Sequence, residues 1–414
     1  MLISFSVQNF LSFKEETTIS MIAGRQTTFS DSLARLNNKT RVLPVAAIYG
    51  GNASGKSNFC EALFWAQSMI LQEVKIDKDE KIRIFYPFEL CKENRTSPST
   101  FNFVISTVND EIYEYSFSFD SEKICKEKLV KIGKGSEDTL FERIFNEYPT
   151  IGKDARLKLI SENTRKNKLF LTNTIEQNHN AYQDVYNWFK HVLRVIPTNA
   201  IFKFEPTVLE DNEWFSKFQQ KLSKLDTGIL RIEEEPLDAS NVTKLSEEDL
   251  VHYEASANER VIKHDKDGKE VYKKFVTFHK CRDGEEYKFR LPQESSGTIR
   301  LIDILPAFLT PENSIAVMVI DEIDQSLHHL LIRRLLENYL QSRGKGARTQ
   351  IIFTTHNLLL MDQEFMRRDE MFLVEKDSYG ESSIKSISDY KEIRIDKDIR
   401  KSYLLGRFGG IPKL

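Results

Sequence analysis

The stretch Gly50-Gly51-Asn52-Ala53-Ser54-Gly55-Lys56-Ser57 decides how the rest of the chain is interpreted. It matches an eight-residue phosphate-binding pattern of Gly, four free positions and Gly-Lys-Ser. The apolar run at residues 45–49 is typical of a buried strand, and residues 58–72 have the spacing of an amphipathic helix. Strand, glycine-rich loop and helix form the context in which this motif binds phosphate, whereas a plain glycine turn with a surface lysine would need neither flank.

The chemistry of such a loop gives its parts separate roles. A loop with few Cβ atoms lets backbone N–H groups wrap phosphates, and the following helix N-terminus adds partial positive charge. Lys56 would reach the β- and γ-phosphates of ATP, and the Ser57 hydroxyl would ligate Mg²⁺. The nucleotide-binding residues that we predict here are Gly50, Gly51, Asn52, Ala53, Ser54, Gly55, Lys56, Ser57 and Asn58.

Composition limits the classes of protein to consider. The chain has 414 residues, enough for two or three domains or for one nucleotide domain with insertions. Its net charge of −3 gives no sign of a DNA-binding protein that is basic over its whole surface. A local basic patch that binds DNA is not excluded by this number. No apolar run reaches membrane-spanning length, and residues 1–5 lack the basic start of a signal peptide. The four cysteines have no metal-ligand spacing, so we expect reduced thiols, a cytoplasmic location and no membrane partner.

A pair of acidic residues follows a second buried strand. Residues 316–320 are continuously apolar, as in a strand covered on both faces, and end in Asp321-Glu322. Carboxylates at this end of a parallel strand lie beside the phosphate loop. We therefore predict that Asp321 holds Mg²⁺ and that Glu322 polarises the attacking water. Two acidic residues that merely open a loop are the alternative.

Two further motifs gain meaning from their order along the chain. Ser295-Ser296-Gly297 precedes an apolar stretch, 301–309, and taken alone is only a plausible helix N-cap. His356 ends the buried run that begins at residue 350, and a lone histidine is usually structural. Their positions on either side of the acidic pair resemble those of the signature motif and the switch histidine of ABC-type ATPases, and this resemblance implies a functional role for both.

The order of these motifs carries a resemblance across nearly the full chain. A strand ending in Asn9-Phe10-Leu11-Ser12-Phe13, then phosphate loop, Ser-Ser-Gly, acidic pair and histidine, resembles ABC-type ATPases of the SMC, RecF and OLD class. The middle position of the first element, basic in much of that class, is Leu11 here. The chain also resembles bacterial AAA ATPases of abortive-infection systems, the group of RloA, AbiLi and the PARIS ATPase subunit. This resemblance implies an α/β fold: an ABC-type P-loop ATPase head with a mixed β-sheet and an inserted helical subdomain.

The resemblance also assigns roles and partners. It implies that His356 contacts the γ-phosphate, so that Glu322, His356 and Lys56 form the catalytic set. Ser295, Ser296 and Gly297 would contact the γ-phosphate held by another subunit, which implies a homodimer or higher oligomer through the nucleotide sites. OLD nucleases append a TOPRIM domain; here we see no nuclease-type acidic cluster and too few residues after His356. We therefore expect a separate effector protein, a nuclease of TOPRIM or RloB-like type, and leave nucleic acid open as a partner.

Three regions are expected. Residues 1–150 would form an N-terminal ATPase lobe, with antiparallel strands at 101–106 and 112–119. Residues 151–280 would form a helical insertion, with loops at the acidic runs 233–235 and 247–249 and a hairpin over 261–278. Residues 281–414 would form the C-terminal ATPase lobe, ending in a glycine-rich tail at 406–412.

Three functions of different classes remain open at this point. The first is an ATP-hydrolysing sensor or scaffold of antiphage defence that controls a separate effector. The second is a DNA-repair ATPase that clamps DNA, which a basic track would favour. The third is a self-sufficient ATP-gated toxin or nuclease, which nuclease activity of the purified chain would favour.

Overall fold

The strand that leads into the phosphate loop, β5 (Val45–Gly50), is buried along its whole length inside a six-stranded sheet. In the computed structural model the order is β11-β16-β17-β5-β18-β19. Every neighbouring pair is parallel except β18 and β19. The bounds are β11 (Leu193–Ile196), β16 (Ile315–Ile320), β17 (Arg348–Thr355), β18 (Met371–Lys376) and β19 (Ser382–Ser386). Because parallel strands end at one edge, the segments after β5, β16 and β17 meet there.

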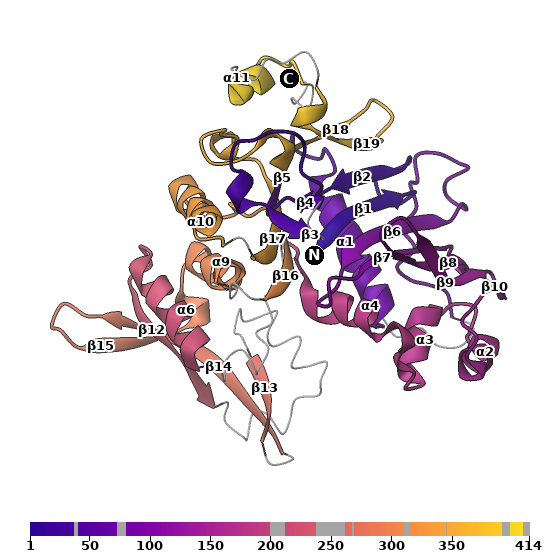
Figure 1. The fold of residues 1–414 in the computed structure, drawn as a ribbon. Coiled ribbons are helices and arrows are strands. Elements are labelled where there is room, and N and C mark those ends of the chain that lie inside the picture. Colours follow the sequence, from indigo (N-terminus) through magenta and orange to yellow (C-terminus); the bar gives the residue numbers. More distant parts are fainter. Residues whose placement is uncertain are drawn as a thin grey trace. The chain divides into compact units, whose positions relative to one another are not determined.

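A second sheet is antiparallel and seven-stranded, in the order β10-β9-β8-β7-β6-β1-β2. Helix α1 (Lys56–Leu71) packs between the two sheets (Figure 1), and the rings of Phe59 on α1 and Phe5 on β1 are 5.4 Å apart. Apolar side chains from α1 and from both sheets are buried together in one core. The bounds are β1 (Leu2–Gln8), β2 (Thr17–Ser20), β6 (Ser99–Ser106), β7 (Ile112–Phe119), β8 (Ile124–Ile132), β9 (Glu137–Ile144) and β10 (Glu147–Thr150).

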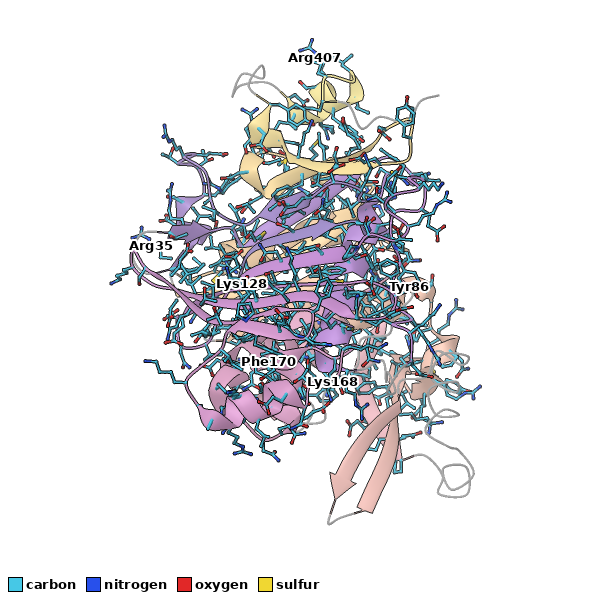
Figure 2. The ribbon with its side chains drawn as sticks, turned by 90° about the vertical axis from the view of Figure 1, so that its right-hand side faces the viewer. Arg35, Tyr86, Lys128, Lys168, Phe170 and Arg407 are labelled. Atoms are coloured by element: carbon cyan, nitrogen blue, oxygen red, sulfur yellow. The ribbon has the colours of Figure 1, made fainter. Side chains whose placement is uncertain are left out.

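The outward face of this second sheet is lined mainly by small polar side chains. One row across the paired strands is Ser6, Asn102, Ser116 and Lys128, the last of which is labelled in Figure 2. The alternate positions carry the phenylalanines of the core, such as Phe101 and Phe117. The alternation seen in the sequence therefore separates a core face from a polar face.

The structure describes residues 1–36, 40–72, 80–198, 212–236, 261–266, 269–309, 314–344, 346–390 and 398–408. The chain divides into two compact units. Unit 1 comprises Met1–Thr198, Glu312–Ile323 and Glu337–Leu414, and unit 2 comprises Asn199–Pro311 and Asp324–Leu336. None of the helices in the described ranges combines the length and the apolar character needed to cross a membrane.

Unit 1 contains both sheets and several helices beside them. Its short two-stranded sheet is made of β3 (Ala34–Leu36) and β4 (Thr40–Val42). Besides α1, its described helices include α2 (Ala155–Glu162), α3 (Phe170–Glu176), α4 (Gln183–Asn187), the π-helical turn η3 (Trp188–Val192) and α11 (Ile399–Leu404). Helix α10 (His329–Gln341) crosses the boundary between the units.

Unit 2 has a sheet of its own. Strand β14 (Lys269–Lys280) pairs with β12 (Ile229–Pro236), β13 (Val261–Lys266) and β15 (Glu286–Arg290), all antiparallel. The described helices of this unit are α6 (Asn212–Lys224) and α9 (Ser296–Ile304). Phe218 of α6 is fully buried, and the ring of Phe215 stacks on that of Phe275 of β14 at 6.5 Å, so helix and sheet share a small core.

The predicted α/β class with a mixed sheet is confirmed, and the helical insertion over 151–280 needs correction. Residues 155–192 are largely helical as expected but belong to unit 1, and α6 is helical in unit 2. Strands β13 and β14 form the hairpin predicted over 261–278, whereas the strand β12 was not predicted. The acidic run 233–235 lies in β12 and not in a loop, because Ile229 and Ile232 bury one face while the acidic side chains pair with lysines. The run 247–249 and the tail 409–412 lie outside the described residues.

Candidate functional site

The phosphate loop has room only for glycine at two of its positions. A Cβ at Gly50 would lie 2.6 Å from the carbonyl oxygen of Val374, and one at Gly55 would lie 2.4 Å from Ser382 Oγ. Gly55 also has a φ of 108°, in the region that L side chains rarely adopt. The backbone of the loop therefore passes close to β18 and β19, and α1 begins directly after it at Lys56.

Two serines far apart in the sequence hold this loop. The Ser382 hydroxyl donates to the carbonyl of Ser54 at 2.7 Å, and the Ser382 N–H donates to the carbonyl of Ser12 at 2.7 Å. Asn58 Nδ2 donates to Ser12 Oγ at 2.8 Å. The Asn-Phe-x-Ser-Phe element at residues 9–13 thus contacts the start of α1 through its serine, while Leu11 donates its N–H to the Tyr86 carbonyl.

Lys56 is folded back over the loop. Its ammonium group donates to the carbonyls of Gly50 at 3.0 Å and Gly51 at 2.9 Å, and only 4% of the residue is exposed. The same nitrogen lies 3.5 Å from Nδ1 of His356. The lysine of the phosphate loop and the histidine after β17 are therefore in contact.

The acidic pair is held by hydroxyl groups of the neighbouring strands. Asp321 is 3% exposed; its Oδ1 accepts a hydrogen bond from Thr354 at 2.5 Å and its Oδ2 accepts one from Thr198. Glu322 has a φ of 47° and donates its N–H to Thr354 Oγ1 at 2.7 Å. A carboxylate with two hydroxyl donors is fixed in orientation, and a non-glycine residue with positive φ is uncommon and clusters at functional sites.

His356 completes a row of polar groups at this edge of the sheet. Its Nε2 lies 4.0 Å from Oε1 of Glu322, while its Nδ1 faces Lys56. Both the His356 and Glu322 side chains keep about a third of their surface exposed, 39% and 34%. The structure thus brings Lys56, His356 and Glu322 together as the sequence predicts.

The residues present fit a nucleotide and Mg²⁺. Ser54 Oγ is buried without a hydrogen-bond partner among the described residues, which suits a donor to a phosphate oxygen. Burial, together with the nearby carboxylate of Asp321, raises the pKa of the Cys60 thiol well above its usual value. Because residues three apart share a helix face, Ser57 lies on the face of α1 that approaches Asp321. Ser57 and Asp321 would hold the metal ion.

The Ser-Ser-Gly motif lies in unit 2, at the start of α9. Ser295 is the N-cap, and its hydroxyl accepts the N–H of Thr298 at 3.0 Å. A Cβ at Gly297 would lie 2.6 Å from the carbonyl oxygen of Ser326, so α9 packs closely on the segment after the acidic pair. Ser295 and Ser296 are exposed. Their predicted contact with a nucleotide on another subunit stays a prediction.

Sequence reasoning missed three residues that support the site, namely Thr198, Thr354 and Ser382. The sequence shows only that Thr354 is polar at the end of an apolar run; its place beside Asp321 depends on the pairing of Phe353 with Ile320, which the structure gives. Thr198 and Ser382 follow or begin short edge strands, whose pairing no local pattern reveals.

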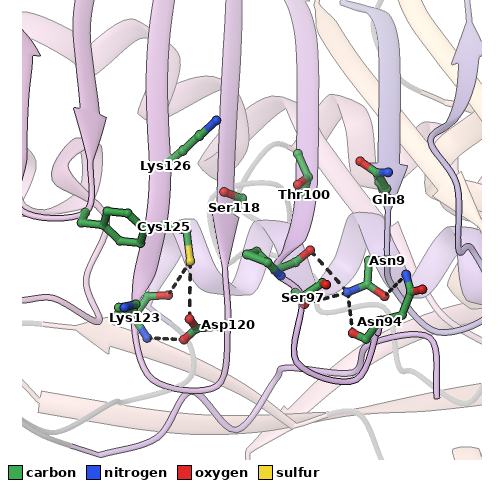
Figure 3. Close-up of a pocket in the computed structure, with 12 residues that line it drawn as sticks. Gln8, Asn9, Asn94, Ser97, Thr100, Ser118, Asp120, Lys123, Cys125 and Lys126 are labelled. Atoms are coloured by element: carbon green, nitrogen blue, oxygen red, sulfur yellow. Dashed lines mark hydrogen bonds between the residues drawn. The ribbon is translucent and has the colours of Figure 1, made fainter. Parts of the chain in front are cut away.

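A pocket of about 570 Å³ lies elsewhere on unit 1, at the end of the polar face of the antiparallel sheet (Figure 3). Asn9 lines it and donates to the carbonyls of Asn94 at 2.9 Å and Ser97 at 2.7 Å. The Cys125 thiol donates to Asp120 at 3.5 Å, and burial raises the pKa of that thiol to about 11. None of the predicted nucleotide-binding residues lines this pocket.

Solved structures of similar fold are distant. The chain is 15% identical to the "SMC head domain from Thermotoga maritima" (93% of this chain and 98% of that chain, TM-score 0.35). It is 12% identical to an Smc head domain with an extended coiled coil derived from Pyrococcus furiosus (94% and 98%, TM-score 0.42). It is also 12% identical to the recombination mediator protein RecF (93% and 98%, TM-score 0.37). With such TM-scores these likenesses carry no argument about function.

A family model gives the stronger result. No curated protein matches the chain. The model described as "AAA domain, putative AbiEii toxin, Type IV TA system" matches residues 45–362. This range begins at β5 and includes the phosphate loop, the Ser-Ser-Gly motif, the acidic pair and His356. The chain therefore belongs to this family of AAA ATPase domains.

Proposed function

We propose that the chain hydrolyses ATP with Mg²⁺ at the edge of the six-stranded sheet. The observation that carries this proposal is the convergence of Lys56, His356 and Glu322, from three separate segments, with the buried Asp321 beside them. Membership of an AAA family supports the same conclusion.

The geometry supports a division of labour between these residues. An incoming triphosphate would accept hydrogen bonds from the loop N–H groups, from Ser54 and from Lys56, which would leave the carbonyls of Gly50 and Gly51. Glu322 would orient the attacking water and take its proton. His356 would donate a hydrogen bond to the γ-phosphate. Mg²⁺, when bound by Ser57 and Asp321, would neutralise charge on the phosphates.

We further propose that the complete site is shared between two subunits. Ser295 and Ser296 are exposed at the start of α9, where hydroxyl groups and helix N–H groups are suited to an anion. In a homodimer, or a higher oligomer built from it, these groups and Gly297 would cover the γ-phosphate held by the partner. ATP would then stabilise the closed dimer, and hydrolysis would release it.

The biological role that fits this chemistry best is control of a separate effector in antiphage defence. The description of the family model names a putative AbiEii toxin and a Type IV TA system. The motif order resembles ATPases of abortive-infection systems such as RloA, AbiLi and the PARIS subunit. The effector would be a nuclease of TOPRIM or RloB-like type. The two alternative functions are a repair ATPase that clamps DNA and a self-sufficient nuclease.

The test combines biochemistry with infection. Purified protein should hydrolyse ATP with Mg²⁺ and leave DNA and RNA intact. Cells carrying the native locus should resist at least one phage, and resistance should require both Glu322 and a neighbouring gene. ATP-dependent DNA clamping without any effect on infection would favour the repair alternative, and cleavage by the chain alone that a substitution in this chain abolishes would favour the nuclease alternative.

A further inference from the structure

We infer that Thr354 is a positioning residue for both acidic side chains of the site, and that its hydroxyl sets the affinity of the site for its metal ion. This inference rests on the proposed ATPase function. Thr354 is fully buried near the end of β17. Because Phe353 pairs with Ile320 in parallel register, Thr354 lies level with Asp321 on the neighbouring strand.

The hydroxyl of Thr354 both donates and accepts a hydrogen bond. It donates to Asp321 Oδ1 at 2.5 Å and accepts the N–H of Glu322 at 2.7 Å. A hydroxyl has one hydrogen and two lone pairs, so this pattern assigns the hydrogen to the Asp321 side. The Thr354 carbonyl also accepts the N–H of Ile323 at 3.0 Å. Three successive residues after β16 are thus tied to one threonine.

The two acidic residues depend on this threonine for different reasons. Asp321 needs its carboxylate plane fixed, and one oxygen each is held by Thr354 of β17 and by Thr198, which lies two residues after β11. Glu322 needs its backbone held at a φ of 47°, which a residue with a Cβ disfavours. The hydrogen bond from its N–H to Thr354 stabilises that conformation. Loss of the hydroxyl would therefore misplace the metal ligand and the general base together.

The experiment compares three variants of the full chain. Thr354→Val keeps the size and removes the hydroxyl, and Thr354→Ser restores the hydroxyl. Thr349→Val is the matched control: Thr349 is buried on the same strand and hydrogen-bonds to Tyr339 at 3.0 Å and Arg343 at 2.9 Å. Mn²⁺ binding in the presence of a non-hydrolysable ATP analogue is measured by electron paramagnetic resonance, together with analogue affinity in EDTA and the melting temperature.

We expect Thr354→Val to weaken Mn²⁺ binding about tenfold to a hundredfold, the usual effect of removing a hydrogen-bond partner of a metal ligand. Affinity for the analogue in EDTA should stay near that of the wild type, and Thr354→Ser should recover most of the Mn²⁺ affinity. Thr349→Val should lower the melting temperature and leave Mn²⁺ affinity unchanged.

Three results would overturn the inference: wild-type Mn²⁺ affinity in Thr354→Val, no recovery in Thr354→Ser, or an equal loss in Thr349→Val. If Thr354→Val does not fold, Thr354→Cys takes its place, because a thiol is a weak donor, and wild-type Mn²⁺ affinity there overturns the inference as well. A wild-type protein that binds neither the analogue nor Mn²⁺ would instead reject the proposed ATPase function.

Discussion

Lys56 Nζ lies 3.5 Å from His356 Nδ1, although 300 residues separate them in the sequence. The contact exists because β5 and β17 are neighbouring parallel strands whose ends lie at one edge of the sheet. Lys56 also donates to two carbonyls of the phosphate loop. A phosphate that draws Lys56 away from these carbonyls would change its contact with His356, which links the occupancy of the loop to the histidine.

Lys56→Ala and Glu322→Gln should separate nucleotide binding from hydrolysis. Lys56→Ala removes the cation nearest the phosphates, so nucleotide affinity should fall. Glu322→Gln leaves Asp321 and the loop intact, so ATP should still bind while turnover falls about a hundredfold or more, as expected when a general base is lost. Equilibrium binding of a fluorescent ATP analogue and phosphate release provide the two measurements. Normal turnover by Glu322→Gln would contradict the role of Glu322.

Gly55→Ala should abolish nucleotide binding, whereas Ser382→Ala should weaken it modestly. A Cβ at Gly55 would overlap Ser382 Oγ, and φ of 108° is unfavourable for alanine. Ser382→Ala removes one hydrogen bond to the loop, a loss of about 1 kcal/mol, or roughly a fivefold drop in affinity if it acts on binding. Ser388→Ala is the control, because its hydroxyl pairs only with Ser386 in the described structure. Equal effects of the two serine substitutions on nucleotide affinity would show that the hydrogen bond from Ser382 to the loop does not support binding.

Ser296→Arg should block a composite site in trans. The alternative substitution Gly297→Arg is less informative, because any side chain at Gly297 would overlap the Ser326 carbonyl within the same subunit. Ser296 is exposed, so an arginine there should leave the fold and ATP binding intact and lower hydrolysis. Mixing Ser296→Arg with Lys56→Ala should restore up to one working site per mixed dimer. Mixed dimers that form but show no recovered hydrolysis would reject the shared site.

Glu370→Gln should remove part of the pH dependence of stability. Burial raises the pKa of Glu370 from 4.5 to about 8, against the opposing effects of Arg367 and Arg343 and with help from Asp369. The folded state thus keeps a proton that the unfolded state has already lost. The stability contributed is full below pH 4.5 and is lost as pH rises towards about 8. Urea unfolding at several pH values should show a flatter profile for Glu370→Gln; an unchanged slope would mean that Glu370 is ionised in the fold.

The sequence predicted those parts of the fold that local patterns encode. Buried apolar runs located β5, β16 and β17, and glycine spacing located the loop between β5 and α1. The meeting of Lys56, Glu322 and His356 followed from the rule that parallel strands end at one edge. These predictions succeeded because the segments are short and almost entirely apolar, which indicates that they are buried.

Other features depended on contacts that no local pattern shows. Four of the eight residues 229–236 are charged, and the two isoleucines were too weak a signal for the strand β12. The hydrogen bond from Ser382 to the phosphate loop joins residues that are 328 positions apart in the sequence. The roles of Thr354 and Thr198 required the register of three strands, which sequence periodicity does not give.

The left-handed backbone at Glu322 also bears on how this site changes over evolution. Asparagine adopts a φ of 47° more readily than glutamate does, so a substitution that ends proton transfer can also relieve backbone strain. We expect Glu322→Asn to melt at a higher temperature than Glu322→Gln, although both should hydrolyse ATP far more slowly than the wild type. Equal melting temperatures would show that the strain is negligible. If Glu322→Asn is the more stable variant, a substitution that removes catalysis also stabilises the fold. Where selection for ATP hydrolysis is lost, we expect such substitutions to accumulate and to leave a protein that binds ATP without hydrolysing it.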